Sequence, residues 1–183
     1  EPIVGCGGQG PLPKTYLKSI YPEIRKQGGL CISDEVQVGF GRLGEYFWGY
    51  EMYDVIPDIV ILGKPIGNGH PMAAVVTTEE ISNSFNNGME FFSSFGGNPV
   101  SCAIGNAVLE VLEEEELPKK ALHVGEFLKQ ELKFLQKQHI ELADIRGEGL
   151  FLGVEILDSD GHPETNLASI IKNELRSKFI LIS

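Results

Sequence analysis

Positive charge, long apolar runs and paired cysteines are all scarce in this sequence of 183 residues. Fifteen lysines and arginines stand against 26 acidic residues, and the formal net charge is −11, so the chain lacks the basic excess needed to coat a nucleic acid or an anionic bilayer. The longest apolar stretches, such as 59–62 and 73–76, are far shorter than the roughly 20 residues of a membrane-spanning helix. We therefore expect no nucleic-acid partner and no membrane span.

The three cysteines, Cys6, Cys31 and Cys102, are odd in number and have no CxxC spacing. This pattern favours reduced thiols and a cytoplasmic location over a disulfide framework. The four histidines keep no ligand spacing with the cysteines, so the sequence predicts no metal site. The chain begins at Glu1, with neither an initiator Met nor a basic-then-apolar leader, and we interpret it as a piece of a larger protein.

Hydrophobic periodicity and turn residues predict alternating helices and strands. Helices are expected between 13 and 28, from Asn98-Pro99 to the acidic run 113–116, and over 119–138 and 166–178; strands are expected over 30–33, 58–62, 72–76, as a pair within 145–157, and over 179–182. Strands that alternate with amphipathic helices indicate an α/β fold, a mostly parallel sheet with helical cover, and the second half resembles a separate α+β layer. We place a domain boundary near Leu117-Pro118.

Two glycine-containing segments match nucleotide-binding motifs only in part. The segment 5–10 fits the GxGxxG pattern, but prolines follow it at once and no strand of adequate length precedes it. Gly63-Lys64 lacks the upstream glycine and the following Ser or Thr of a P-loop. Nucleotide binding is therefore a remote alternative.

Polar residues follow two of the expected strands. Asp34 comes directly after the strand 30–33, and Lys64 follows the strand 58–62 after a single glycine. Ligands of open α/β sheets bind at the carboxyl ends of the strands, where both residues are expected. Each also has an ordinary structural explanation, since a strand-end aspartate often caps a turn and a lone lysine is usually solvated.

Three segments together resemble a known family. DEVQVGFGR at 34–42, PDIV at 57–60 leading into GKPIGNG at 63–69, and SFGGNP at 94–99 are similar, in this order, to motifs of the class-III pyridoxal-phosphate-dependent aminotransferases. Further likeness, in CGGQ at 6–9 and GNPVSCA at 97–103, points to the alanine–glyoxylate aminotransferase 2-like branch, which includes ethanolamine-phosphate phospho-lyases. Family members are much longer than this chain.

The resemblance implies pyridoxal 5′-phosphate as cofactor and assigns a role to each candidate residue. Lys64 would hold the cofactor as an aldimine and then move the substrate's Cα proton, which requires a desolvated amine. Asp34 would face the pyridine nitrogen and keep it protonated. Val36 would pack on one ring face, and Gln37 would lie near the phenolic oxygen. Ser94, where most members carry Thr, would bind the cofactor phosphate of a partner subunit, which implies a homodimer with shared active sites.

The resemblance also implies a fold and marks what the chain lacks. Residues 1–117 would be part of the large domain of a fold-type I enzyme, and 118–183 part of its small C-terminal domain. Cys6 stands where many family aminotransferases carry Glu. The upstream phosphate-binding cup, the aromatic residue stacked on the ring and the C-terminal arginine that grips substrate carboxylates have no counterparts here. We therefore expect the isolated piece to be inactive.

The function implied is transfer of an amino group from a small-molecule amine or amino acid to a keto acid. An alternative with the same cofactor is a phospho-lyase, which eliminates phosphate and ammonia from a phosphorylated amine such as phosphoethanolamine. A third alternative is a catalytically incomplete fragment that acts only in dimerisation. The sequence leaves the choice among them open, together with the substrate and the amino acceptor.

Overall fold

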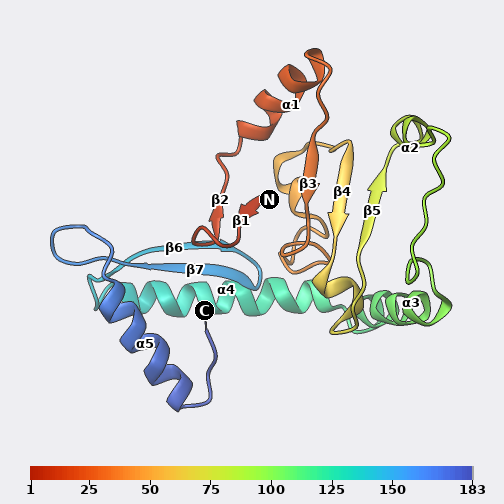
Figure 1. Cartoon of the computed structure of the whole chain (residues 1–183). Helices are drawn as coiled ribbons and strands as arrows, with labels where there is room; N and C mark the ends of the chain where they lie inside the picture. Colours follow the sequence, from red (N-terminus) through yellow and green to blue (C-terminus); the bar gives the residue numbers. More distant parts are fainter. Residues whose placement is uncertain (183) are drawn as a thin grey trace.

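The computed structural model describes residues 1–182 and has the α/β composition that the sequence predicts (Figure 1). The strands are β1 (Ile3–Val4), β2 (Gly10–Pro11), β3 (Ile32–Asp34), β4 (Ile59–Leu62), β5 (Ala74–Thr77), β6 (Leu142–Glu148) and β7 (Phe151–Ile156). The α-helices are α1 (Tyr16–Lys26), α2 (Glu79–Phe85), α3 (Pro99–Glu114), α4 (Leu117–Gln136) and α5 (Thr165–Ser177), and the 3₁₀ turns are η1 (Gly49–Tyr53) and η2 (Lys64–Gly67).

The central sheet has the strand order β3-β4-β5 and is mixed. β3 and β4 are parallel, as predicted, with Asp34 opposite Ile61, whereas β5 runs antiparallel to β4, with Ala74 opposite Leu62. The connection between β4 and β5, residues 63–73, is too short to hold the crossover helix that a parallel neighbour requires. The expected mostly parallel sheet is therefore limited, within residues 1–182, to the pair β3–β4.

Helices α3 and α4 follow each other along one side of the molecule (Figure 1). Asn98 caps α3 as predicted, since its Oδ1 accepts a hydrogen bond from the Ser101 amide at 2.9 Å. The break between the helices is made by Glu116, which has a left-handed backbone with φ 50°. This break lies close to the boundary expected at 117–118, but the division into domains stays a prediction.

The hairpin β6–β7 lies along α4 (Figure 1) and is joined to it by a close backbone approach. A Cβ atom at Gly125 of α4 would collide with the carbonyl of Gly149, in the turn between β6 and β7. Only glycine fits there. On the other side of the hairpin, Arg146 of β6 donates from Nε to the carbonyl of Gly8 at 2.7 Å, which joins the C-terminal part of the chain to its N-terminal segment.

The core lies beneath the loop that follows β3. One buried cluster contains Ile3, Val38 and Leu43, and a second contains Phe40, Leu62 and Ile66. Around the second cluster the rings of Phe40, Phe47 and Trp48 meet edge to face. Burial of these apolar side chains holds the loop against the sheet.

One further expectation from the sequence differs from the structure, and the rejection of the GxGxxG match is confirmed. The predicted strand over 179–182 is wrong: Phe179 has φ 64°, and the Ile180 amide donates to the carbonyl of Leu175 at 2.9 Å, so this backbone closes the end of α5. A strand also needs a neighbouring edge, and these residues pair with none in the part of the chain described. The segment 5–10, which matched GxGxxG, links two antiparallel strands instead of opening a helix, which removes the context of a dinucleotide fingerprint.

Within residues 1–182, no helix is both long and apolar enough to span a membrane.

Candidate active site

Asp34 and Lys64 lie at the same edge of the central sheet. Asp34 is the last residue of β3 and pairs with Ile61 of β4, and Lys64 follows the end of β4 after Gly63. The amide of Glu35 also donates to the carbonyl of Ile61 at 2.9 Å, which keeps the two strand ends in register. Because the strands are parallel, the carboxylate and the amine both emerge at the carboxyl edge, where ligands of α/β sheets bind.

Val36 brings the two strand ends into direct contact. A Cβ atom built on Gly63 would lie 3.3 Å from both methyl groups of Val36, so the backbone before Lys64 rests on this side chain. The Val36 amide donates to Oδ1 of Asp34 at 3.0 Å and thereby orients the carboxylate. Among the hydrogen bonds of residues 1–182, Oδ2 of Asp34 receives none, which leaves it free for a donor supplied by a ligand.

Lys64 has an unusual backbone conformation. Its φ is 34°, in the left-handed region that favours glycine, and the next residue is Pro65, which further restricts the residue before it. A non-glycine residue held in a sparsely populated conformation costs about 1–3 kcal/mol, and such residues cluster at functional sites. The Lys64 side chain is exposed, so residues 1–182 do not themselves provide the desolvation expected for its amine.

Gln37 lies beside the N-terminal segment. A Cβ atom on Gly5 would be 3.5 Å from Cγ of Gln37 and 3.4 Å from the ring of Phe151, so these side chains surround the Gly5 backbone. The Gly5 amide donates to Oε2 of Glu1 at 2.9 Å. The exposed Cys6 follows directly. The residue that departs from the family pattern thus sits in the turn that Gln37 contacts.

Ser94 is placed elsewhere. It is exposed and belongs to the segment between α2 and α3, which runs past β5 on the side away from β3 (Figure 1). The chain therefore brings Asp34, Val36 and Lys64 to one edge of the sheet, places Gln37 on the loop that follows β3, against the N-terminal segment, and leaves Ser94 apart from them.

Glu35 is a residue of this edge that the sequence reasoning passed over. It is fully buried and accepts hydrogen bonds from Ser33 Oγ at 2.8 Å, the Gly49 amide at 2.7 Å and the Tyr50 amide at 3.0 Å. Burial raises the pKa of this carboxyl, and the three hydrogen bonds offset only part of that effect. The sequence does show a second acidic residue directly after the apolar strand. The pattern is the same whether such a carboxylate is exposed to water or buried, so it does not reveal the burial of Glu35.

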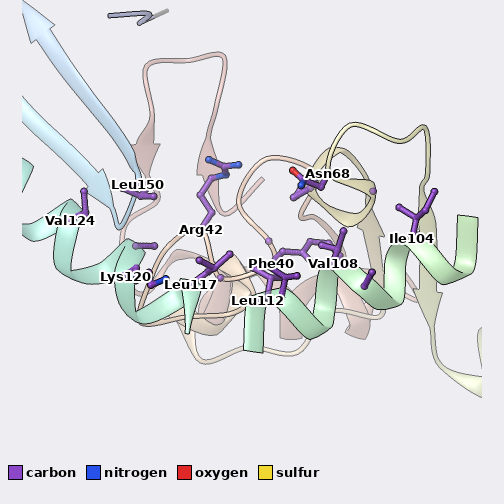
Figure 2. A pocket seen from close by; sticks show the side chains of 17 residues that line it. Phe40, Arg42, Asn68, Ile104, Val108, Leu112, Leu117, Lys120, Val124 and Leu150 are labelled. Carbon is purple, nitrogen blue, oxygen red and sulfur yellow. The ribbon is translucent and has the colours of Figure 1, made fainter. Parts of the chain in front are cut away.

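An apolar hollow of about 610 Å³ borders η2, whose residues Pro65 and Gly67 belong to its lining (Figure 2). Side chains of α3 and α4, such as Val108, Leu112 and Leu117, face Phe40 across it, and Arg42 and Lys120 are its cationic lining residues. Neither Asp34 nor Lys64 lines the hollow. It therefore neighbours the polar edge of the sheet and is not the same site.

The family model described as "Aminotransferase class-III" matches residues 1–177, and the chain belongs to this family. Members of the family are enzymes that use pyridoxal phosphate, and they include aminotransferases and phospho-lyases. The amine, the carboxylate with one free oxygen and the apolar side chain between them fit that cofactor, since it needs an amine for its aldehyde, an anion for its ring nitrogen and an apolar contact for its ring face.

Curated relatives and solved structures agree on the branch. The chain is 46% identical over 179 residues to alanine–glyoxylate aminotransferase 2-like of Drosophila melanogaster, covering 96% of this chain and 36% of the relative. It is 48% identical over 157 residues to the human mitochondrial alanine–glyoxylate aminotransferase 2, covering 86% of this chain and 30% of the relative. A solved phospholyase from Arthrobacter in complex with phosphoethanolamine matches with a TM-score of 0.96 and 42% identity, over 100% of this chain and 44% of that one. The chain thus spans less than half the length of each.

Proposed function

We propose that this chain carries the cofactor-binding lysine and carboxylate of a pyridoxal-phosphate-dependent aminotransferase, which moves an amino group from an amine or amino acid to a keto acid. The observation that carries the proposal is the parallel register of β3 and β4, which puts Asp34 and Lys64 at one edge with Val36 against Gly63. Residues 1–117 would belong to the cofactor-binding large domain and residues 118–183 to the small C-terminal domain.

Bound pyridoxal phosphate supplies an aldehyde that condenses with amines and a ring that accepts the electron pair of a bond broken at the substrate's Cα. Lys64 would hold the cofactor through its Nζ and would then carry the substrate's Cα proton as base and acid. Asp34 would face the ring nitrogen with its free Oδ2, and a carboxylate there would favour the charged form of that nitrogen. Val36 would support one ring face, and Gln37 would lie near the ring's phenolic oxygen.

The remaining expectations concern partners and location. The exposed position of Ser94 supports a role in the site of a second subunit, in which its hydroxyl and the amides of the following glycines bind the cofactor phosphate. The protein would then be a homodimer with shared sites. The free cysteines among residues 1–182 support a reducing compartment, and we propose the cytoplasm, although the human relative is named as mitochondrial.

A phospho-lyase is the second candidate, and one observation favours it. The Arthrobacter phospholyase, solved in complex with phosphoethanolamine, matches the whole chain at a TM-score of 0.96. In this reaction Lys64 would take the same Cα proton, but the electron pair would expel phosphate from the adjacent carbon, and water would then release ammonia and an aldehyde. In transamination the amino group and the electron pair pass instead to a keto acid. The residues of this edge serve both outcomes.

One experiment tests both candidates in the complete protein. Wild type and Lys64→Ala are loaded with pyridoxal phosphate, their visible absorbance is recorded, and each is incubated with phosphoethanolamine or with an amino acid and glyoxylate. We expect a visible cofactor band in wild type that is lost in Lys64→Ala, and new amino acid from the glyoxylate mixture. Free phosphate from phosphoethanolamine, with no amino transfer, would replace the first candidate by the second. A band unchanged in Lys64→Ala would contradict both, and an unloaded, inactive wild type would favour the dimerisation fragment.

A further inference from the structure

His70 lies in the β4–β5 loop that carries Lys64, and its ring reaches the first turn of α3. Its Nε2 lies 2.7 Å from Oγ of Ser101. Ser101 Oγ also accepts a hydrogen bond from Nδ2 of Asn98 at 2.9 Å, while Oδ1 of Asn98 accepts from the Ser101 amide at 2.9 Å. The last contact fixes the orientation of the Asn98 amide, because only its oxygen can accept from a backbone N–H. The three side chains therefore form one chain of hydrogen bonds from the loop to the start of the helix.

The β4–β5 loop, residues 63–73, contains two strained positions. Lys64 and Asn68, at the two ends of η2, have φ of 34° and 43°, although neither is glycine. Such conformations persist only where the surrounding structure over-determines them. The His70 amide donates to the carbonyl of Gly67 at 2.9 Å, so the histidine is attached directly to η2. The histidine is therefore joined through Gly67 to the turn that begins at Lys64.

Helix α3 touches this loop at a second point, which is apolar. A Cβ atom on Gly105 would lie 2.9 Å from Cε of Met72, so α3 rests on the methionine just after His70. Methionine is flexible and adapts to its surroundings, so this contact holds the loop near the helix without setting its orientation. A hydrogen bond is directional, and the one between His70 and Ser101 supplies the orientation that the apolar contact lacks.

We propose that His70 is a positioning residue for Lys64 and acts through Ser101 and Asn98; this inference rests on the proposed function. Asn98 also donates from Nδ2 to the carbonyl of Phe95 at 2.7 Å, and Phe95 follows Ser94 directly. The same hydrogen bonds thus join the lysine loop to the segment that offers Ser94 to the second subunit. One set of contacts thus holds both the lysine of this chain and the serine that it would offer to the site of the second subunit.

The test uses the complete protein with His70→Ala, His70→Gln, Ser101→Ala and the double alanine variant, and His123→Ala as control. His123 is an exposed histidine of α4, distant in sequence from the loop. Ser101→Ala keeps the backbone amide that Asn98 caps. Two quantities are measured: the Kd for pyridoxal phosphate by absorbance titration, and amide hydrogen exchange of peptides spanning 64–72 and 94–98 in the cofactor-free protein.

We expect His70→Ala and Ser101→Ala each to weaken cofactor binding by about three- to tenfold, the range that the loss of one hydrogen bond produces. The double variant should bind the cofactor no more weakly than Ser101→Ala, because that change already removes the contact with His70. Exchange should accelerate in the two peptides alone, and His70→Gln should restore both measurements, since its amide reaches about as far as the imidazole Nε2.

Three results would overturn this role for His70. The first is a Kd and an exchange rate in His70→Ala that equal those of wild type. The second is a loss of cofactor affinity in the double variant that equals the sum of the two single losses. The third is faster exchange throughout the protein. If the cofactor band survives in Lys64→Ala, the proposed function fails. If the band is lost there while His70→Ala behaves as wild type, only the role of His70 fails.

Discussion

At the scale of single residues, Glu35 shows how a buried carboxylate organises this edge of the sheet. Its two oxygens accept from the amides of Gly49 and Tyr50 at the start of η1, which returns the long loop to the end of β3. A buried carboxylate without such partners would be strongly unfavourable, so the amides and the side chain stabilise each other. Glu35 stands between Asp34 and Val36 and thereby fixes the backbone from which both project.

We predict that Glu35→Gln lowers the free energy of unfolding by about 1–3 kcal/mol, because the amide group turns a hydrogen-bond donor toward buried donors. Burial raises the pKa of Glu35 above the ordinary value of 4.5, so the folded state binds its proton more tightly than the unfolded state. The stability that this proton contributes is present below pH 4.5 and is lost as the pH rises through the folded pKa. The difference in the free energy of unfolding between wild type and Glu35→Gln should therefore shrink as the pH rises.

Denaturant unfolding over a range of pH measures this difference. Glu51→Gln is the matched control, because Glu51 is an exposed carboxylate of the same turn that accepts from the Trp48 amide. A difference in the free energy of unfolding that grows with pH would contradict this prediction for Glu35. An equal loss of stability in Glu35→Gln and Glu51→Gln would also contradict it.

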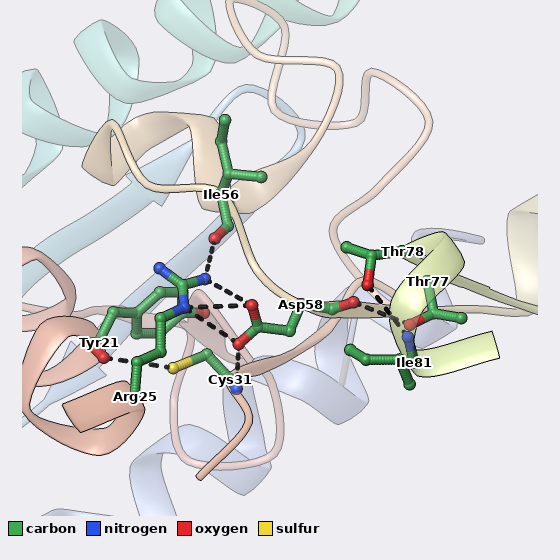
Figure 3. Close-up of polar contacts among 8 residues, drawn as sticks. All are labelled: Tyr21, Arg25, Cys31, Ile56, Asp58, Thr77, Thr78 and Ile81. Carbon is green, nitrogen blue, oxygen red and sulfur yellow. Dashed lines mark hydrogen bonds and ion pairs between the residues drawn. The ribbon is translucent and has the colours of Figure 1, made fainter. Parts of the chain in front are cut away.

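At the scale of elements, a group of polar contacts joins α1 to the beginnings of β3 and β4 (Figure 3). Because the two strands are parallel, this edge is opposite the one that carries Asp34 and Lys64. The Asp58 carboxylate accepts from Nε of Arg25 at 3.1 Å and from the Cys31 amide at 2.7 Å. Arg25 also donates to the carbonyl of Ile56 at 2.6 Å, and the carbonyl of Asp58 accepts from the Thr77 hydroxyl at 3.0 Å. One acidic residue thus connects a helix with all three strands of the sheet.

We predict that Asp58→Asn lowers the free energy of unfolding by about 1–3 kcal/mol at pH 7 and by less in acid. Burial alone would raise the pKa of Asp58, but Arg25 and the Cys31 amide outweigh it and lower this pKa. Stability from a carboxyl with a lowered pKa is present above its unfolded pKa and is lost as the pH falls through the folded one. Thermal unfolding at pH 7 and pH 3 checks the prediction.

The control for Asp58 is Asp54→Asn. Asp54 pairs with Lys18 at 2.7 Å, but both side chains are largely exposed, and ion pairs in water contribute little. An equal loss of stability in the two variants, or a loss at Asp58 that does not change with pH, would show that Asp58 does not act through its charge.

At the scale of the whole molecule, much apolar surface is left uncovered by residues 1–182. Between α2 and α3, Phe91, Phe92 and Phe95 are 74%, 80% and 86% exposed. Large exposed apolar patches are rare on monomeric proteins and mark surfaces that pack against other protein. This uncovered segment contains Ser94, which agrees with the proposal that it faces a second subunit.

We predict that mixed subunits of the complete protein complement each other. Lys64→Ala and Ser94→Ala homodimers should each have low activity at limiting cofactor. In a heterodimer of the two variants, one shared site contains both substitutions, and the other contains the unchanged Lys64 of one subunit and the unchanged Ser94 of the other. Random mixing should restore roughly a quarter of the wild-type activity, as expected for a two-fold symmetric dimer. Activity is measured before and after subunit exchange, with either variant exchanged against itself as control. Activity that stays at the mean of the two variants would contradict the shared site.

The sequence by itself determined the local elements and much of the candidate site. Periodicity located all the longer helices, and Asn98 before Pro99 set the start of α3, because capping and amphipathicity are read within a few residues. The end of a buried strand likewise marked Asp34 and Lys64 before their neighbours were known. The short helix α2 was missed, although Thr78 followed by two glutamates is an N-terminal signal.

Only the tertiary structure decided the features that depend on distant partners. The direction of β5, the failure of 179–182 to form a strand, the burial of Glu35 and the pairing of His70 with Ser101 each need a group that lies far away in the sequence or a neighbouring edge. Local sequence patterns predict the conformation and the candidate roles of a residue. Which donor reaches a carboxylate, and whether a strand finds a neighbour, are settled by packing, where residues far apart in the chain compete for the same space.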